Sequence, residues 1–328
     1  MRAAWYERTG PARRVLHVGE LPTPDPGDGE VRVKLATSGV NPSDVKTRAG
    51  LRSATLPFPR IVPHSDGAGV IDAVGAGVSS SRIGERVWIW NAAWKRPNGT
   101  AAQYVVLPAE QAVRLPNAVP FDAGACLGIP ALTALHAVRV DGGVTGKTVL
   151  VTGGAGAVGH YAIQMAKLSG ALRVLTTVSS RDKAALARAA GADLALDYRR
   201  DDVAARVLEA TNGGGVDRVI EVDFGANVAA SLASVKAEGE IVVYGSGKPE
   251  IVVPFFPALV KSVRLRFFIV YNLNAADRSA ALAELTDWLE QGRLQHVIAS
   301  RFPLDAIVEA HEQVESGRAI GNVVLEIA

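Results

Sequence analysis

Cysteine, excess charge of either sign and long apolar runs are all scarce or missing in this 328-residue sequence. The single cysteine, Cys126, excludes an intrachain disulfide, which favours a reducing compartment. The formal net charge is only +2, and no long run of Lys or Arg occurs, which argues against a nucleic-acid partner. No stretch reaches the roughly 18 consecutive apolar residues of a membrane helix, and the N-terminal MRAAWYERTG lacks the apolar core of a signal peptide. We therefore expect a cytoplasmic protein that binds neither nucleic acid nor membrane.

Glycine is abundant, and its most informative cluster follows an apolar run. Residues 148–152 are β-branched or apolar, as is typical of a buried parallel strand. Gly154, Gly156 and Gly159 come next at G-x-G-x-x-G spacing, and residues 158–168 have helical character. A tight turn into a helix N-terminus presents free N–H groups and the positive end of the helix dipole to a pyrophosphate. Because strand, turn and helix occur together, the segment predicts a dinucleotide site rather than a plain turn.

The length predicts two domains, at about 150 residues each. Residues 1–122 contain short strands bounded by Gly, Pro, Asn or Ser, which indicates a β-barrel-like domain. Residues 123–271 begin with a helix at 123–138, broken or bent by Gly128 and Pro130, and then alternate between strands and helices, which predicts a parallel sheet covered on both faces. We expect strands at 31–35, 69–74, 86–90, 102–106, 148–152, 173–178, near 194, 218–222, 240–244 and 264–271, and helices at 158–168, 182–190, 202–210 and 226–235.

The C-terminal residues 272–328 return to a different pattern. Leu282, Leu285 and Leu289 lie on one face of a helix that Gly292 ends, and a second helix over 304–315 precedes a strand at 322–327. A lone terminal strand needs a sheet to join, and the barrel is the expected host. Residues 1–122 and 272–328 would then form one domain with 123–271 inserted, which predicts an active site in the cleft between them.

Two loops of the barrel carry polar residues. Asn41 can cap a short helix that has Pro42 at its first position. The loop over 56–66 contains three prolines and ends in His64-Ser65-Asp66. Polar groups on loops that a rigid scaffold holds are candidates for lining a site.

The end of the strand at 173–178 indicates which nicotinamide cofactor is used. In NAD-binding folds a carboxylate at this position accepts hydrogen bonds from the adenosine ribose. Here the strand is followed by Ser179 and Ser180, with Arg181 and Lys183 close behind. Hydroxyl, guanidinium and ammonium groups suit a 2′-phosphate. The sequence therefore favours NADP(H) over NAD(H).

With these elements placed, the sequence resembles the zinc-free quinone oxidoreductase (zeta-crystallin-like) branch of the medium-chain dehydrogenase/reductase superfamily. The motifs that carry the resemblance are GVNPSD at 39–44, SDGAG at 65–69, LTA at 132–134 and the glycine turn at 153–159. The resemblance implies an α/β protein, with a GroES-like β-barrel catalytic domain and an inserted Rossmann domain with a doubly wound parallel sheet. It further implies NADPH as cofactor and often a homodimer joined edge to edge through the Rossmann sheets, here at 264–271.

The resemblance also assigns residues to the cofactor. For Tyr198 and Arg318, an ordinary half-buried aromatic and a surface arginine account for the residues equally well. The implied set is Asn41 and Thr133 near the nicotinamide, Gly153, Gly154, Gly156, Ala157 and Val158 at the pyrophosphate, Ser179, Ser180, Lys183, Tyr198 and Arg318 around the 2′-phosphate, Gly245 and Ser246 near the adenosine, and Tyr271.

Zinc enzymes of the same superfamily hold a catalytic ion through Cys and His ligands. By the motif match, the corresponding positions here are Asn41 or Val40, Ser65 and Gly128, none of which is a soft ligand, so no metal is expected. Without a metal to polarise an alcohol, the expected hydride acceptor is already electron-poor, such as a quinone or an α,β-unsaturated carbonyl compound. Asn41, through its amide, and Lys46, through its ammonium, are the candidates for stabilising the resulting anion. Lys46 stands where the family commonly has tyrosine.

Several alternatives stay open at this point. Trp90, Trp94 or Tyr271 could line the acceptor site, although the tryptophans are as consistent with packing on the barrel. An enoyl or alkenal double-bond reductase is the rival enzyme, and Arg60, Lys95 and Arg96 give it thin support through an acidic carrier. A non-catalytic NADPH-binding protein is the rival from another class. Turnover of a benzoquinone against an enone would separate the two enzymes, and cofactor binding without turnover would indicate the third.

Overall fold

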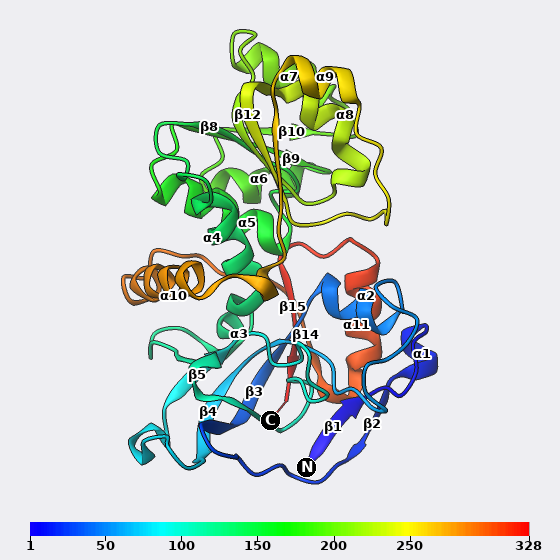
Figure 1. Cartoon of the computed structure of the whole chain (residues 1–328), viewed down its shortest axis with the longest axis vertical. Helices are drawn as coiled ribbons and strands as arrows, with labels where there is room; N and C mark the ends of the chain where they lie inside the picture. Colours follow the sequence, from blue (N-terminus) through cyan, green and yellow to red (C-terminus); the bar gives the residue numbers. More distant parts are fainter. Residues whose placement is uncertain (328) are drawn as a thin grey trace. The chain divides into compact units, whose positions relative to one another are not determined.

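The computed structural model describes residues 1–327 and divides into two compact units. The first unit comprises residues 1–130 together with the C-terminal residues from 286, and the second comprises residues 131–285. In Figure 1 the first unit runs from blue to cyan and returns in orange and red, whereas the second runs from green to orange. The predicted domain boundaries, after residue 122 and after residue 271, stay a prediction.

The first unit is built on a seven-stranded sheet centred on β3 (Glu30–Val40). Val31, Val33 and Leu35 alternate with polar residues along β3 and are buried, which confirms the period-two pattern. The terminal strand β15 pairs antiparallel with β3, so the C-terminus does join the barrel sheet. The strands of this unit are β1 (Arg2–Trp5), β2 (His17–Glu20), β3, β4 (Asp66–Val74), β5 (Arg86–Ile89), β6 (Tyr104–Pro108), β7 (Ala112–Arg114), β14 (Ile298–Pro303) and β15 (Asn322–Glu326).

Short helices connect these strands. The helix predicted after Asn41 is α2 (Pro42–Arg48), with Asn41 at its N-cap and proline at its first position. Asn41 and Asp44 form a capping box in which the backbone N–H of Asn41 donates to Asp44 Oδ2 at 2.8 Å. The other helices of the unit are α1 (Ala12–Val15), α3 (Phe121–Gly124) and α11 (Ile307–Glu315), together with 3₁₀ turns at Ser80–Arg82, Ala109–Gln111 and Leu304–Ala306.

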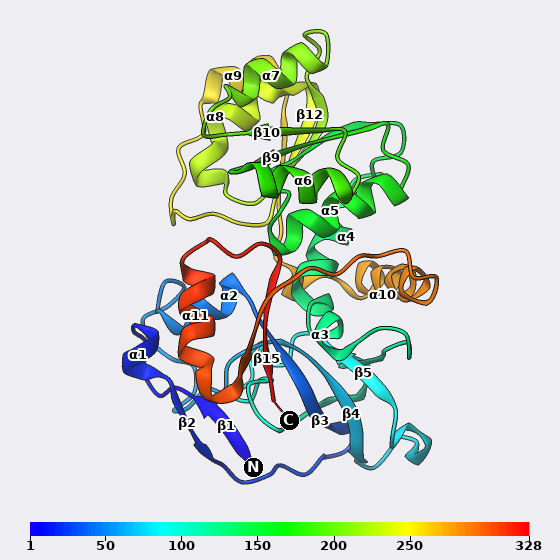
Figure 2. The ribbon, with the colours of Figure 1, turned by 180° about the vertical axis from the view of Figure 1, so that it is seen from behind.

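The second unit contains a six-stranded, all-parallel sheet in the order β10-β9-β8-β11-β12-β13. Figures 1 and 2 show α4, α5 and α6 along one face of this sheet and α7, α8 and α9 along the other, which is the predicted doubly wound arrangement. The strands are β8 (Thr148–Val151), β9 (Arg173–Val178), β10 (Leu194–Asp197), β11 (Val216–Glu221), β12 (Val235–Val243) and β13 (Arg264–Phe267). The helices are α4 (Leu132–Arg139), α5 (Ala157–Leu168), α6 (Arg181–Ala189), α7 (Val203–Ala210), α8 (Phe224–Ser234), α9 (Phe255–Val260) and α10 (Ala275–Glu290), which continues past residue 285.

Three segments differ from their predicted form. The expected helix over 123–138 is divided into α3, a π-helical turn at Leu127–Ala131 that contains Pro130, and α4, because proline has no N–H to donate within a helix. The expected strand over 264–271 ends at Phe267, and Val270–Asn272 is a 3₁₀ turn whose carbonyls at 270 and 271 accept from Arg278. Strand β12 begins at Val235 rather than 240, beyond a register shift in its pairing with β11. Strands β1, β2 and β14 were not predicted.

A buried ion pair lies inside the second unit. Arg218 on β11 and Glu240 on β12 are both inaccessible to solvent, with Arg218 Nη2 2.7 Å from Glu240 Oε2. The remaining N–H groups of Arg218 donate to the carbonyls of Ala137, Val138 and Val140, at 3.0, 2.8 and 2.6 Å. These carbonyls belong to the last turn of α4, where the helix itself offers no donors. The guanidinium therefore fixes the C-terminal end of α4 to the centre of the sheet.

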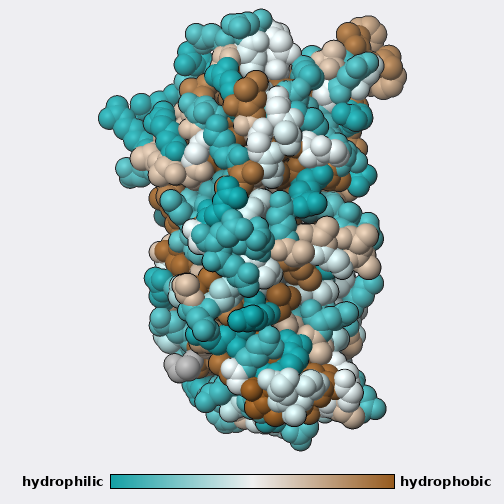
Figure 3. Space-filling view, turned by 90° about the vertical axis from the view of Figure 1, so that its left-hand side faces the viewer, coloured by the Kyte–Doolittle hydropathy of each residue, from teal (hydrophilic) through white to brown (hydrophobic). Residues whose placement is uncertain are grey.

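The surface shown in Figure 3 has apolar side chains interspersed with polar ones. Within residues 1–327, none of the helices has both the length and the apolar character that a membrane span requires.

Candidate functional site

The glycine turn follows β8 and is fixed by two threonines of the neighbouring strand β9. The N–H of Gly153 donates to Thr177 Oγ1 and the N–H of Gly154 donates to the Thr177 carbonyl, both at 3.0 Å. Gly153 has φ +69°, and a Cβ on Gly154 would lie 2.0 Å from Thr176 Oγ1. The turn therefore requires glycine at both positions, for conformation at the first and for space at the second.

The N-terminus of α5 opens from this turn. Gly156 is the N-cap residue, and no side chain caps the first turn, in which Ala157 and Val158 stand. A Cβ on Gly156 would meet only the Gly153 carbonyl, at 3.2 Å, so the space beside the N-cap is left open. Free N–H groups on a twelve-residue helix with no acidic residue in the first turn fit the pyrophosphate of a dinucleotide.

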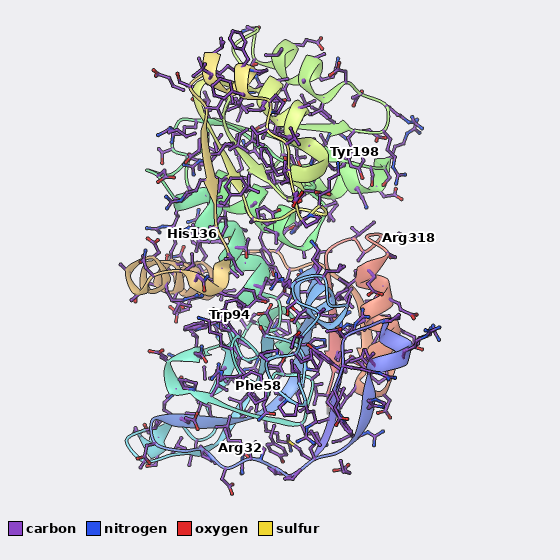
Figure 4. All side chains as sticks on the ribbon, turned by 45° about the vertical axis from the view of Figure 1, so that its right-hand side comes forward. Arg32, Phe58, Trp94, His136, Tyr198 and Arg318 are labelled. Carbon is purple, nitrogen blue, oxygen red and sulfur yellow. The ribbon has the colours of Figure 1, made fainter. Side chains whose placement is uncertain are left out.

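Polar residues gather at the carboxyl ends of β9 and β10. Ser180 is the N-cap of α6, and its Oγ accepts from the N–H of Lys183 at 3.3 Å, which leaves the hydroxyl proton available. Tyr198 follows β10, and its N–H donates to the Val178 carbonyl at 3.1 Å, so Tyr198 lies beside Ser179 at one edge of the sheet. The Tyr198 side chain is 53% exposed (Figure 4). The structure thus brings together every predicted 2′-phosphate residue of the second unit. Arg318 lies in the first unit, between α11 and β15.

Glu221, which the sequence analysis did not identify, organises the next part of the same edge. Its Oε1 accepts from Thr152 Oγ1 at 3.0 Å, from the N–H of Asp223 at 2.7 Å and from Asn227 Nδ2 at 2.9 Å. Its Oε2 accepts from Ser231 Oγ at 2.7 Å. A fully buried carboxylate with four donors holds the ends of β8 and β11 and the start of α8 in one arrangement.

The other predicted cofactor residues of this unit lie on separate elements. Gly245 and Ser246 follow β12, and the Ser246 hydroxyl donates to the Lys248 carbonyl at 2.8 Å. Thr133 is buried in the first turn of α4, and Tyr271 is buried in the 3₁₀ turn after β13.

In the first unit, Asp66 joins two segments around Asn41. Its Oδ2 accepts from Asn41 Nδ2 at 2.8 Å and from the N–H of Ile129 at 3.0 Å. Asn41 is only 4% exposed, and Asp66 is fully buried. Burial raises the pKa of Asp66 well above its usual value and raises that of Asp44 to about 7, because both carboxylates lose hydration. Asn41 therefore keeps one amide proton for a ligand, since its other is donated to Asp66.

A chain of hydrogen bonds runs from the backbone of Asp66 to the C-terminal part of the unit. Thr100 Oγ1 donates to the Asp66 carbonyl at 2.5 Å, so it must accept from Ser38 Oγ, 2.7 Å away. Ser38, with its one proton donated, accepts from His64 Nδ1 at 2.9 Å. His64 Nε2 is then an acceptor, and His311 Nε2 donates to it at 2.9 Å. The rings of the two histidines stack, and burial lowers the pKa of His64 to about 3, so the pair is neutral.

The remaining predicted residues of the first unit are less enclosed. Lys46 is partly exposed on α2. Trp90 is buried beyond β5, whereas Trp94 is half-buried with Lys95 Nζ 5.9 Å from its ring centroid (Figure 4). The structure places Asn41 and Lys46 on one helical turn, but it gives neither tryptophan a polar contact with Asn41.

Comparisons with known proteins agree with this geometry. Residues 27–117 match the family model of the alcohol dehydrogenase GroES-like domain, and residues 157–291 match that of zinc-binding dehydrogenase. A quinone oxidoreductase of Pongo abelii is 30% identical over 98% of this chain and 95% of its own length. A 2-haloacrylate reductase of a Burkholderia species is 31% identical over 99% and 98%.

Solved structures match the whole chain as well. An NAD-dependent alcohol dehydrogenase has a TM-score of 0.91 at 31% identity, and a mycobacterial protein complexed with NADPH has a TM-score of 0.88 at 32% identity. Both matches cover 100% of each chain. The chain belongs to the quinone oxidoreductase branch of the medium-chain dehydrogenase/reductase superfamily. The predicted family and fold are thereby confirmed, and this quinone oxidoreductase relative is an oxidoreductase.

The name of one matched family model raises the question of zinc, and the residues of this quinone oxidoreductase relative do not fit that ion. Both ring nitrogens of His64 are engaged, by Ser38 and by His311. Cys126 is buried and donates its Sγ proton to the Asp122 carbonyl at 3.1 Å. Over residues 1–327, no three His, Cys, Asp or Glu side chains cluster in a way that could hold a metal.

Proposed function

We propose that this protein transfers hydride from NADPH to a quinone or a related electron-poor acceptor. The observation that carries the cofactor assignment is the edge of the second unit's sheet, where an uncapped α5 and the hydroxyl and ammonium groups of Ser180 and Lys183 follow adjacent strands. No carboxylate follows β9 directly, so a 2′-phosphate meets no repulsion there. The NADPH complex of the mycobacterial relative supports the same cofactor.

The chemistry follows from the donors around Asn41. NADPH, when bound, supplies a hydride. The amide proton that Asn41 does not donate to Asp66 is available to an oxygen on which negative charge develops, and the Lys46 ammonium is a second donor on the same helix. Asp66 and the capping box hold the Asn41 amide in one orientation before the acceptor arrives, so that positioning contributes to the rate.

A double-bond reductase is the second candidate. The 2-haloacrylate reductase relative supports it, because that protein's name describes an acceptor whose alkene is conjugated to a carboxylate. The same two donors would then stabilise an enolate in place of a quinol anion.

Steady-state oxidation of NADPH by 1,4-benzoquinone, cyclohexenone and 2-chloroacrylate tests both candidates. We expect benzoquinone to give the largest kcat/KM, and Asn41→Ala to lower it by about 10- to 100-fold. A larger kcat/KM for cyclohexenone or 2-chloroacrylate would favour the reductase. Binding of NADPH without turnover of any of the three would favour a non-catalytic role, and preference for NADH would contradict the cofactor assignment.

We also propose that two copies associate through β13. This strand is the edge of the sheet, so one side of its backbone has no partner strand among residues 1–327. Large apolar side chains are exposed beside it, on β13 at Phe267 and on α9 at Phe255 and Phe256. The buried thiol of Cys126 is compatible with the reducing cytoplasm that we expect for this protein.

A further inference from the structure

The second unit has a cavity of 380 Å³ beyond the end of β13, on the opposite edge of the sheet from β9 and β10. Its apolar lining includes Phe268, Ile269 and Leu273. Its polar lining includes His136 of α4, Arg266 of β13 and Asn272. A volume above about 300 Å³ with a few convergent polar groups is typical of a small-molecule site.

His136 is the buried polar group of this cavity. Its side chain is on α4 near α10 (Figure 4), it is only 6% exposed, and its ring packs against Phe268 with centroids 4.6 Å apart. Neither ring nitrogen has a hydrogen-bond partner in the part of the chain that the structure describes. Burial lowers the pKa of His136, so the neutral ring offers one N–H donor and one acceptor. Buried polar groups in proteins are nearly always satisfied, so a ligand or water must meet this ring.

Arg266 and Asn272 add further donors on the same cavity. Arg266 donates no side-chain hydrogen bond to any described residue, and its nearest carboxylate oxygen, Asp141 Oδ1, is 3.8 Å away. The Asn272 side chain is also without a protein partner over residues 1–327. Two cavity groups with N–H donors and a buried imidazole thus face one apolar lining.

The acidic residue of the cavity limits the charge of a ligand. Asp277 Oδ2 accepts from Asn274 Nδ2 at 2.9 Å, and the N–H of Asp277 donates to Asn274 Oδ1 at 2.8 Å, at the start of α10. Asp277 is therefore engaged in capping its helix, yet it keeps its negative charge. A dianion such as phosphate would meet this charge with only one guanidinium to offset it, whereas a monoanion would not exceed the available positive charge.

We propose that this cavity binds a small molecule with one carboxylate and an apolar body of about the size of a single ring. The carboxylate accepts from the Arg266 guanidinium and from the His136 ring N–H, and the apolar body lies on Phe268, Ile269 and Leu273. This site is separate from the proposed hydride-transfer site, and it does not depend on that proposal.

Isothermal titration of the full-length protein with benzoate, in the absence of nicotinamide cofactor, tests the site. We expect saturable binding of benzoate and at least 10-fold weaker binding of benzamide, which has the same ring without the charge. Arg266→Gln and His136→Phe should each weaken benzoate binding at least 10-fold. Arg264→Gln is the matched control, because Arg264 lies on the same face of β13 but does not line the cavity, and it should bind as the wild type does.

Folding and oligomeric state are controlled separately. Thermal unfolding, sedimentation and NADPH affinity are measured for each variant, and His136→Gln, which keeps an N–H donor, should recover part of the lost benzoate affinity. Absence of saturable binding at millimolar benzoate would overturn the proposal, as would equal losses in Arg266→Gln and Arg264→Gln or equal affinity for benzamide. None of these outcomes depends on turnover of a quinone.

Discussion

Asp66 accepts hydrogen bonds from three separate segments of the first unit. Two buried N–H groups, of the Asn41 amide and of the Ile129 backbone, donate to one of its carboxylate oxygens, and Thr100 donates to its carbonyl. Replacing Asp66 by Ala leaves those two N–H groups without an acceptor, and each should cost about 1–3 kcal/mol of unfolding free energy. Urea unfolding measures the change. Asp72→Ala is the control on the same strand: Asp72 pairs with Arg32 near the surface, so a loss under about 1 kcal/mol is expected. Equal losses would contradict the role of Asp66.

Asp44 should make stability depend on pH. Its pKa is raised by burial from 3.8 to about 7, so the native state holds a proton that the unfolded state has lost between those values. Stability therefore falls as the pH rises through this range, by up to about 1.4 kcal/mol per pH unit. Asp44→Asn should flatten that slope in urea unfolding between pH 5 and pH 7. Asp25→Asn, at an exposed carboxylate, should leave the slope unchanged, and an unchanged slope in Asp44→Asn would disprove the assignment.

Local residue chemistry was predictable, whereas contacts between distant residues were not. Asn41 and Pro42 announce a helix start because capping depends on neighbours in sequence. The partner of His64 is His311, 247 positions later, and no local pattern connects them. Glu221 was missed for the same reason, since Thr152, one of its donors, is 69 positions away.

At the scale of elements, the turn from β8 to α5 separates the requirements of folding from those of binding. Gly154→Ala places a methyl group 2.0 Å from Thr176 Oγ1, so it should lower both stability and NADPH affinity. Gly156→Ala meets only one backbone oxygen, at 3.2 Å, but its methyl group lies beside the open N-cap. We expect Gly156→Ala to keep nearly wild-type urea unfolding and to weaken NADPH binding about 10-fold. Wild-type NADPH affinity in Gly156→Ala, by fluorescence titration, would argue against a pyrophosphate at this helix.

The first turn of α6 should decide between the two nicotinamide cofactors. Lys183→Ala removes an ammonium beside Ser180, and a charge-assisted hydrogen bond of about 1.5–3 kcal/mol corresponds to a loss of roughly 10- to 100-fold in NADPH affinity. Affinity for NADH should not change. Lys167→Ala, which removes a lysine paired with Asp193 at the other end of α5, is the matched control. A parallel loss for both cofactors would indicate that Lys183 does not contact the 2′-phosphate.

Sequence periodicity located most elements, and it failed where backbone geometry overrides it. Strands β8 and β9 and helix α5 lie within a residue of their predicted ends, because each has a strong apolar pattern and a clear terminator. The segment after Phe267 is as apolar as a strand, yet it turns, because Arg278 holds the carbonyls of residues 270 and 271. That anchor belongs to a later helix and leaves no trace in the strand's own sequence.

For the molecule as a whole, the proposed pairing of two copies at β13 predicts a change in oligomeric state. Phe267 is 58% exposed on the edge strand, so Phe267→Lys places a charge in the paired surface and should convert a dimer to a monomer in sedimentation equilibrium. Leu51→Lys, at a residue that is 74% exposed elsewhere, should leave the mass unchanged. A monomeric wild-type protein would disprove the pairing.

The predicted two-part organisation rested on a change of period along the chain, and the return of the C-terminus followed from one unpartnered strand. Antiparallel pairing of β15 with β3 confirms that return. The sequence gave no sign that β14 would lie beside β15, because its residues alternate only weakly between buried and exposed. The residues implied by family resemblance for the cofactor stay predictions until the variants above are measured.

The buried contact of Arg218 with Glu240 and with the last carbonyls of α4 has a consequence for hydrogen exchange. Fraying of the C-terminal turn of α4 would strand a guanidinium and a carboxylate away from water, so local opening of that turn is strongly disfavoured. Amide protons near Val138, which lie next to an exposed turn at 141–143, should therefore exchange with deuterium as slowly as those of the central strand β11. In Arg218→Met the helix end should exchange long before the sheet does.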